Sequence, residues 1–232
     1  MSNKANFKVD PRLASLLGEN YRSTEHALKE LVDNSWDADA TKIIITLPEI
    51  VTSDPVVIED TGTGMTEKEL RNEYLVVADD RRSRKGDRTN RLKRLVKGRK
   101  GIGKFAGLMV ASIMEIETTA RGNTTRIVIS KEDLLKASRD LEQIDLPLTV
   151  SPAPEGVSGT KVTLHNLNNR YAFPLPEKLK ALLMIEYGRE EDVRITVNEE
   201  PLGLDDLPGE HFQEDDSVPE AGNVRVILGS EL

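Results

Sequence analysis

The sequence predicts an α+β protein, and three observations lead to that class. Near the N-terminus a long helical pattern carries apolar residues on one side and acids on the other. In the middle of the chain, residues 113–119 and 124–130 alternate on either side of a short turn, which is typical of a β-hairpin. Short β-branched stretches such as 41–47 stand between further helical patterns. A chain of 232 residues is long enough for one good-sized domain or one domain with an appendage.

The composition predicts a globular cytoplasmic protein. Charged residues make up 31% of the chain and hydrophobic residues 38%, with a formal charge of -8. The sequence has no apolar run near the length of a membrane span, and its first residues lack an apolar signal core, so we expect no membrane partner. Cysteine is absent, which excludes disulfides, thiolate zinc sites and cysteine nucleophiles. The three histidines are too scattered to suggest a metal cluster.

One strongly basic segment interrupts this acidic chain. Twelve lysines and arginines lie between Arg81 and Lys104, against a single acid, Asp87. Residues 79–100 show no clean apolar period, so we expect a mobile loop. Its charge suits the phosphates of a nucleotide or of a nucleic acid, and both alternatives stay open. The acidity of the whole chain argues only against non-specific nucleic-acid binding by the entire surface.

The long helix is expected to run from Ser23 or Thr24 to about Ala40, after a short helix at 11–17. At about 100° per residue, Asn34 and Asp37 fall within about 60° of Glu30. The same arc also holds His26 and Asp33. This stripe is either a solvated face or a general base and a metal ligand one helical turn apart.

A second strand, at 56–59, runs directly into Asp60-Thr-Gly-Thr-Gly-Met65. A carboxylate at a strand end can accept a hydrogen bond from an exocyclic amine, and Gly62 and Gly64 let the backbone approach a ligand closely. A plain turn after a strand explains the motif equally well. A helix is expected next, because residues 66–69 form a capping-box pattern.

A glycine-rich turn, Gly98-Arg-Lys-Gly-Ile-Gly-Lys104, then opens a helix. Free N–H groups at a helix start bind phosphate. The spacing is not that of a Walker A motif, because Phe105 follows the lysine. An ordinary helix start is the alternative.

The rest of the chain predicts further strands and helices. We expect helices at 131–139 and 176–187, and strands at 146–150, 159–167, 193–197 and 224–228. Residues 203–220 are rich in acids and prolines, so we expect an exposed loop there. The sequence stops directly after a strand pattern, which suggests the N-terminal fragment of a longer protein.

The order of these motifs resembles the GHKL ATPase superfamily of gyrase, Hsp90, histidine kinases and MutL, over roughly residues 20–167. A helix with Glu30-x-x-x-Asn34 precedes DxGxG, a long loop, the glycine-rich helix start and a Gly159-Thr160 strand. The resemblance implies a Bergerat fold, a two-layer α/β sandwich with a mixed, mostly antiparallel sheet and helices on one face. It implies an ATP-binding domain at 1–170 with its lid at about 79–100, and we expect residues 171–232 to form a helix-and-strand extension packed on the same domain.

The resemblance also implies a role for each matched residue. Glu30 would be the general base, Asn34 would hold Mg²⁺, and Asp60 would bind the adenine amine. The other implied nucleotide-binding residues are Asp37, Gly62, Gly64, Met65, Gly101, Ile102, Gly103, Lys104 and Thr160. Gly101, Gly103 and Lys104 would meet the phosphates, and Thr160 would support the adenine contact. The role of Asp33 stays open.

Residues 35–37, Ser-Trp-Asp, separate the branches, because histidine kinases usually carry a basic residue there. The motif looks more like Hsp90, gyrase, MutL and MORC-type ATPases, although Lys104 stands where Hsp90 has an aromatic residue. The resemblance implies Mg²⁺-dependent binding and slow hydrolysis of ATP, with lid closure and nucleotide-dependent homodimerisation, and a protein client or nucleic acid as a further partner. The alternatives are the catalytic module of a histidine kinase and an ATP sensor that does not hydrolyse.

Overall fold

The computed structural model of this chain describes residues 3–5, 23–49, 52–76, 86–98, 103–136, 146–167, 174–208, 210–218 and 222–230. The helix expected at 11–17 and four residues of the glycine-rich turn, 99–102, which include Gly101 and Ile102, lie outside these ranges. Within them, no helix is both long and apolar enough to cross a lipid bilayer.

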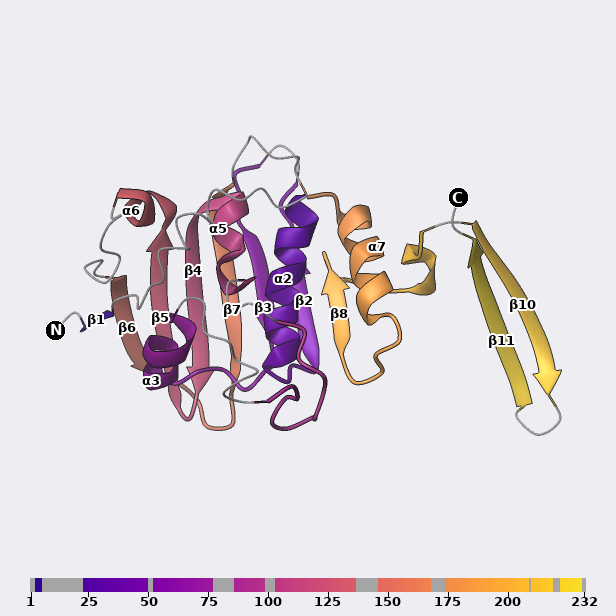
Figure 1. Ribbon diagram of the computed structural model, residues 1–232, viewed down its shortest axis with the longest axis horizontal. Coiled ribbons are helices and arrows are strands. Elements are labelled where there is room, and N and C mark those ends of the chain that lie inside the picture. The colour runs from indigo at the N-terminus through magenta and orange to yellow at the C-terminus, as the bar shows by residue number, and fades with distance from the viewer. Residues whose placement is uncertain are drawn as a thin grey trace.

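One twisted sheet of nine strands organises the described chain (Figure 1). The strands are β1 Asn3–Ala5, β2 Lys42–Thr46, β3 Val56–Asp60, β4 Ala111–Ala120, β5 Asn123–Ser130, β6 Leu146–Pro152, β7 Gly159–Leu167, β8 Arg194–Val197 and β9 Glu200–Pro201. Their order is β1-β6-β5-β4-β7-β3-β2-β8-β9. Only β2 and β8 pair in parallel, so the expected mixed and mostly antiparallel sheet is confirmed.

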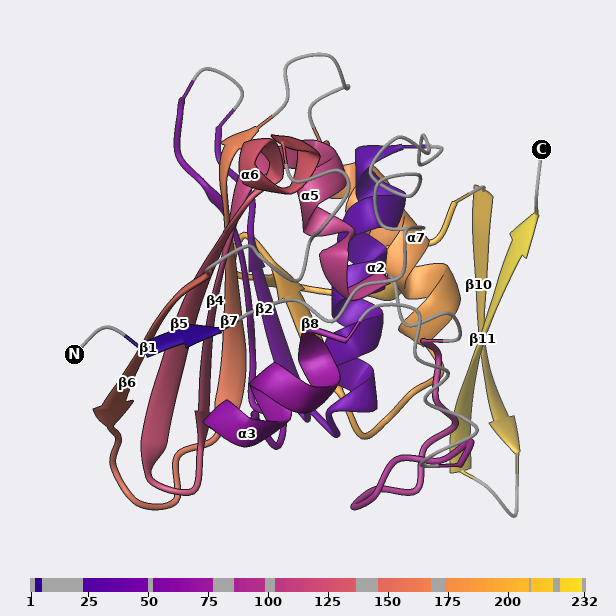
Figure 2. The ribbon, with the colours of Figure 1, turned by 60° about the vertical axis from the view of Figure 1, so that its left-hand side comes forward.

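The helices lie together on one face of this sheet, as Figure 2 shows. They are α2 Thr24–Asp37, α3 Glu67–Glu69, the π-helical turn η1 Leu70–Tyr74, the 3₁₀ turn η2 Gly103–Phe105, α5 Gly107–Val110, α6 Lys131–Lys136, α7 Pro176–Tyr187 and the 3₁₀ turn η4 Leu204–Asp206. The two-layer arrangement implied by the resemblance is confirmed. The capping box at the start of α3 and the bounds of α7 are also as expected.

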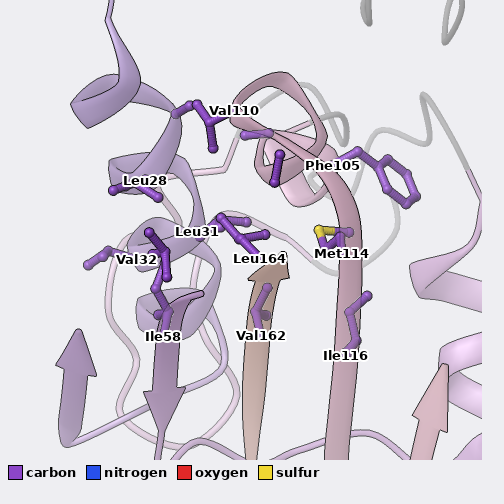
Figure 3. Packing of buried hydrophobic residues seen from close by; sticks show 14 of the residues in the cluster. Leu28, Leu31, Val32, Ile58, Phe105, Val110, Met114, Ile116, Val162 and Leu164 are labelled. Atoms are coloured by element: carbon purple, nitrogen blue, oxygen red, sulfur yellow. The ribbon is translucent and has the colours of Figure 1, made fainter. Parts of the chain in front are cut away.

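The central helix α2 is positioned by its ends and by its apolar face. The hydroxyl of Ser23 caps its first turn by accepting the His26 N–H at 3.4 Å. Three buried side chains, Leu28, Leu31 and Val32, lie on its sheet side. Figure 3 shows them above the strand residues Ile58, Val162 and Leu164. Burying each large aliphatic side chain contributes about 1.5–3 kcal/mol. The polar stripe that begins at Glu30 is therefore turned away from the sheet.

Strand register places four polar side chains in one row across the middle of the sheet. Asp60 of β3 lies opposite Thr160 of β7, Thr160 opposite Thr118 of β4, and Thr118 opposite Thr125 of β5. Opposite residues in an antiparallel pair project to the same face. Asp60, Thr118 and Thr125 are all buried. Sheet pairing alone thus assembles a polar row at the level where β3 ends.

Two expectations about irregular structure are wrong. Residues 203–220 do not form an exposed loop throughout, because β10 (Glu210–Val218) pairs with β11 (Gly222–Ser230) as an antiparallel hairpin that projects beyond α7 (Figure 1). The helix expected after the glycine-rich turn is short and broken into η2 and α5, since the chain passes into β4 at Ala111.

The described part of the basic segment, residues 86–98, is a compact turn fastened to the rest of the molecule. Arg94 is only 6% exposed, donates to the Ala40 carbonyl at 2.6 Å, and pairs with Asp192 at 2.7 Å. Its guanidinium also lies 4.2 Å from the ring centre of Trp36. The Asp39 carboxylate accepts two backbone N–H groups of the same turn. These contacts attach residues 86–98 to the rest of the domain, and the mobility expected for residues 79–100 stays a prediction.

Candidate functional site

The site begins at Asp60, where β3 ends. Its carboxylate is 9% exposed and accepts three hydrogen bonds, from the Ser35 hydroxyl at 2.8 Å, the Gly62 N–H at 2.8 Å and the Thr160 N–H at 3.2 Å. Burial raises the pKa of Asp60 above the usual aspartate value, while these three donors act in the opposite direction. The carboxylate is therefore held in one orientation by α2, β7 and its own turn.

The glycines of the Asp60 turn are required by close contacts. A Cβ on Gly62 would stand 2.8 Å from the Ala38 carbonyl oxygen. Gly64 has a φ of 60°, and a Cβ there would stand 1.9 Å from the Thr119 carbonyl oxygen. Only glycine tolerates both the backbone angle and the approach. The turn therefore packs directly against α2 and β4. This packing brings the Met65 N–H to Thr118, in the polar row across the sheet.

Thr118 belongs to the same site and was missed from the sequence. Its fully buried hydroxyl accepts the Met65 N–H at 2.8 Å and lies 3.1 Å from the Thr160 hydroxyl. The missed signal was its place in β4, where the inward positions are Met114, Ile116, Thr118 and Ala120. A single hydroxyl in an otherwise apolar row marks a polar contact. Ser35 was missed because it lies on the sheet side of α2.

The second half of the site lies on α2. Glu30 and Asn34 are half-buried and one helical turn apart. A Cβ on Gly103 would stand 2.1 Å from the Glu30 Oε2 atom, so a larger residue here would displace this carboxylate. The structure thus brings the start of η2 against Glu30, and the phosphate contacts expected for Gly101 and Gly103 stay a prediction.

Lys104 has protein partners in this structure. Its ammonium donates to the Val76 carbonyl at 2.6 Å and to the Glu73 carbonyl at 3.1 Å, at the end of η1. The same ammonium lies 5.6 Å from the ring centres of Tyr74 and Phe105. In this arrangement Lys104 ties η1 to η2, and its contact with phosphate stays a prediction.

Two further acids of α2 have protein partners. The two oxygens of Asp37 accept the Lys97 N–H at 2.9 Å and the Gly98 N–H at 3.1 Å. Asp33 pairs with Lys29 at 2.9 Å and accepts the Tyr187 hydroxyl at 2.5 Å. Asp33 is therefore a structural partner, which settles the role left open by the sequence. Asp37 binds the end of the basic segment.

The oxygen donors around Asn34 fit a Mg²⁺ ion that is also coordinated by the phosphates of a nucleotide. Among the described residues, no three histidines or acids gather in a way that could hold a metal by themselves. Mg²⁺ commonly takes one or two protein oxygens and completes its octahedron with water and substrate phosphates. The Asn34 amide oxygen beside the Glu30 carboxylate is such a partial set, on the face of α2 that Gly103 approaches.

A buried carboxylate at a strand end, a glycine turn beside it, and an acid and an amide on the covering helix define a nucleotide site of the Bergerat type. Residues 21–160 match the family described as "Histidine kinase-, DNA gyrase B-, and HSP90-like ATPase". The chain belongs to this family, the GHKL ATPases, and is similar to its Hsp90-like branch.

Three curated proteins illustrate the likeness. The "Putative type II restriction enzyme HgiDII" of Herpetosiphon aurantiacus is 31% identical over 60% of this chain and 22% of its own length. The "Chaperone protein HtpG" is 28% identical in Treponema denticola, over 72% of this chain and 29% of the relative. The "Chaperone protein HtpG" of Myxococcus xanthus is 26% identical over 76% of this chain and 28% of the relative. The chain thus spans less than a third of the length of these relatives.

Proposed function

We propose that this chain binds ATP together with Mg²⁺ and hydrolyses it slowly. The observation that carries the proposal is the oriented carboxylate of Asp60. It lies in the same row of the sheet as Thr160 and Thr118. It also accepts a hydrogen bond from Ser35, on the helix that bears Glu30 and Asn34. Membership of the GHKL family supports nucleotide binding. The finer statements, on hydrolysis and on what it drives, are inferences from the geometry.

At the base end, Asp60 accepts the amino group of adenine. Three protein donors already fix its carboxylate, so it need not reorganise when the base arrives. The Gly62–Met65 turn supplies backbone that a flat ring can approach. Met65 is kept in place by the Thr118 hydroxyl, and Thr160 holds Asp60 through its N–H.

At the phosphate end, Glu30 takes a proton from the attacking water. Asn34 offers its amide oxygen to Mg²⁺, and the metal supplies neutralising charge on the phosphates when bound. Glu30 and Asn34 are one helical turn apart, so they address the same phosphate from the same side. Gly103 leaves room beside the carboxylate. Catalysis would come mainly from positioning, with a general base adding about 10²–10⁴-fold.

Nucleotide-dependent closure of the lid and pairing of two copies extend this proposal. The support is the family and the cationic segment at 86–98, whose exposed side chains include Arg88, Arg91 and Lys93. ADP would be released when the lid reopens. The names of the relatives point to a chaperone-like role on a protein client or to a nucleic-acid partner. DNA titration at two salt concentrations separates these, because phosphate contacts lose affinity steeply as salt rises.

The central test is ATP hydrolysis by Glu30→Gln. This variant keeps the size of the side chain and removes its basicity, so we expect turnover to fall about 10²–10⁴-fold while ATP still binds. Glu177→Gln, an exposed acid on α7, is the matched control and should hydrolyse ATP normally. Wild-type turnover in Glu30→Gln would refute the general-base role. Tight ATP binding without any turnover by the wild type would identify a sensor instead.

A further inference from the structure

Lys97 stands at the junction of three elements. Its backbone N–H donates to Asp37 of α2 at 2.9 Å. Its ammonium reaches in another direction, to the Glu186 carboxylate of α7 at 2.7 Å and to the Glu186 carbonyl at 3.3 Å. The last residue before Gly98 is thus fixed both by the helix that bears Glu30 and by a helix beyond residue 170.

Aromatic rings hold the same lysine. The ammonium of Lys97 lies 4.3 Å from the ring centre of Tyr187 and 5.3 Å from that of Trp36. The two rings are tilted against each other with centres 5.5 Å apart, a favourable separation for an aromatic pair. A partly desolvated cation over aromatic faces is stabilised by their negative electrostatic potential. The ring of Tyr187 therefore helps to hold the Lys97 ammonium in place.

The hydroxyl of Tyr187 connects the Lys97 contact to α2. This hydroxyl donates to Asp33 at 2.5 Å, and both residues are buried. Asp33 directly precedes Asn34 and is also paired with Lys29 at 2.9 Å. Burial and then the charge of Asp33 raise the pKa of Tyr187, so the phenol keeps its proton and acts as the donor.

These contacts determine where the chain enters the glycine-rich segment. Gly98 follows Lys97, and a Cβ there would stand 2.9 Å from the Asp37 carboxylate. At the far end of the segment, Gly103 passes against Glu30. Glu30 and Asp37 are seven residues apart, about 10 Å along α2. The segment therefore has both its ends fixed on the face of α2 that carries Asn34.

We propose that Lys97, Tyr187 and Asp37 are positioning residues for the phosphate end of the nucleotide site, and that α7 is a functional part of that site. The inference rests on the proposed function. None of the three need touch the nucleotide. They act by fixing Gly98, the entry to the glycine-rich segment, on the helix that holds Glu30 and Asn34. The base end, at Asp60 and Thr118, is built by strand pairing and by the hydrogen bond from Ser35, so we expect substitutions of Lys97 or Tyr187 to leave it intact.

The experiment compares binding of adenosine and of ATP with Mg²⁺ by calorimetry, together with ATP turnover. Lys97→Met keeps the aliphatic stem and loses the charge, while Tyr187→Phe keeps the ring and loses the bond to Asp33. For each variant we expect adenosine affinity equal to wild type, and ATP affinity or turnover lowered about ten-fold, since each removes one charged contact. Lys97→Arg, which preserves charge and ring contact, should recover most of the loss.

Lys178→Met is the matched control, since it removes an exposed lysine of α7. It should bind both ligands normally. Equal losses for adenosine and ATP would overturn the positioning role in favour of general destabilisation, and no loss for either ligand would overturn it outright. A wild-type protein that binds neither ligand would refute the proposed function itself. If Lys97→Met does not fold, Tyr187→Phe gives the same comparison with a smaller change.

Discussion

The two ends of the nucleotide site are built by different means. At the base end, Asp60, Thr160 and Thr118 lie opposite one another in adjacent strands, so the register of the sheet brings them together. At the phosphate end, Glu30 and Asn34 lie on a single helix, Gly103 lies against Glu30, and Lys97 is held by side chains of α2 and α7. One end is fixed by backbone pairing and the other by side-chain contacts.

This difference predicts how each end responds to change. A register shift would move every side chain of a strand to the other face, so the relative placement of Asp60, Thr160 and Thr118 can change only together with the sheet. The phosphate end can be loosened by a single substitution without unfolding the sheet. The base end should therefore behave as a fixed receptor and the phosphate end as the adjustable part. The following substitutions test that contrast, from the largest expected effect to the smallest.

Asp60→Asn should give the largest loss. The amide oxygen can keep the bonds from Gly62 and Thr160, but the amide nitrogen then faces the Ser35 hydroxyl and the amine of the base. Losing a charged acceptor and adding a misplaced donor should weaken binding roughly 10²–10³-fold. Calorimetry with adenosine and ATP measures the loss, which should be equal for both. A loss for ATP alone would contradict the assignment of Asp60 to the base.

Gly103→Ala should act on the other end. The added methyl group would stand 2.1 Å from the Glu30 Oε2 atom, so the carboxylate must move. Displacing a catalytic group by about 1 Å can lower turnover about 10²-fold. Adenosine affinity should stay at the wild-type value. Gly122→Ala, in a turn with nothing within 4 Å of the new methyl group but with a φ of 77°, reports the cost of a strained glycine alone.

Thr118→Val should have a smaller effect, because the shape of the side chain is preserved. The Met65 N–H and the Thr160 hydroxyl lose their common partner. Leaving buried polar groups unpaired costs about 1–3 kcal/mol, so affinity for adenosine should fall about ten-fold. Thr125→Val, one strand further along the same row, removes a buried hydroxyl without a hydrogen-bond partner among the described residues and should leave affinity unchanged.

Acid should weaken the contact between Glu186 and Lys97. Burial acts to raise the pKa of Glu186, but the hydrogen bond from Lys97 and the charges of Lys29 and Lys97 together outweigh it and leave that pKa below the ordinary value of 4.5. A carboxylate with a lowered pKa in the folded state contributes stability above its unfolded pKa and loses it as the pH falls through the folded value. The difference in melting temperature between wild type and Glu186→Gln should therefore shrink below pH 4.5. A difference that stays constant with pH would contradict the link.

The sequence predicted the parts of this site that follow from local patterns. The polar stripe of α2, the turn after Asp60 and the hairpin of β4 and β5 all have short-range signals in residue spacing. The partners of Ser35 and Thr118 could not be predicted, because they depend on which strands lie under α2 and beside β4. The anchoring of Arg94 depends on Asp192, nearly a hundred residues away.

The acid-rich strand β10 escaped prediction for a related reason. Residues 210–218 lack the β-branched and apolar alternation by which strands are recognised, and β-propensity is weak for acids. What makes them a strand is backbone pairing with β11, whose residues 224–228 do show the pattern. A hairpin can thus be recognised from the strand with the clearer pattern, here β11, if its partner is sought on the other side of the turn.

The parallel pairing of β8 with β2 has a consequence for how the chain is made. β2 is synthesised early, yet its outer edge is covered only when residues 194–197 arrive, about 150 positions later. Until then a row of unpaired N–H and C=O groups beside Ile43 and Ile45 is open to other chains, which is the usual route to edge-to-edge aggregation. A chain cut at residue 170 would keep every nucleotide motif and still carry that open edge. Preparations of this protein should therefore extend beyond Val197.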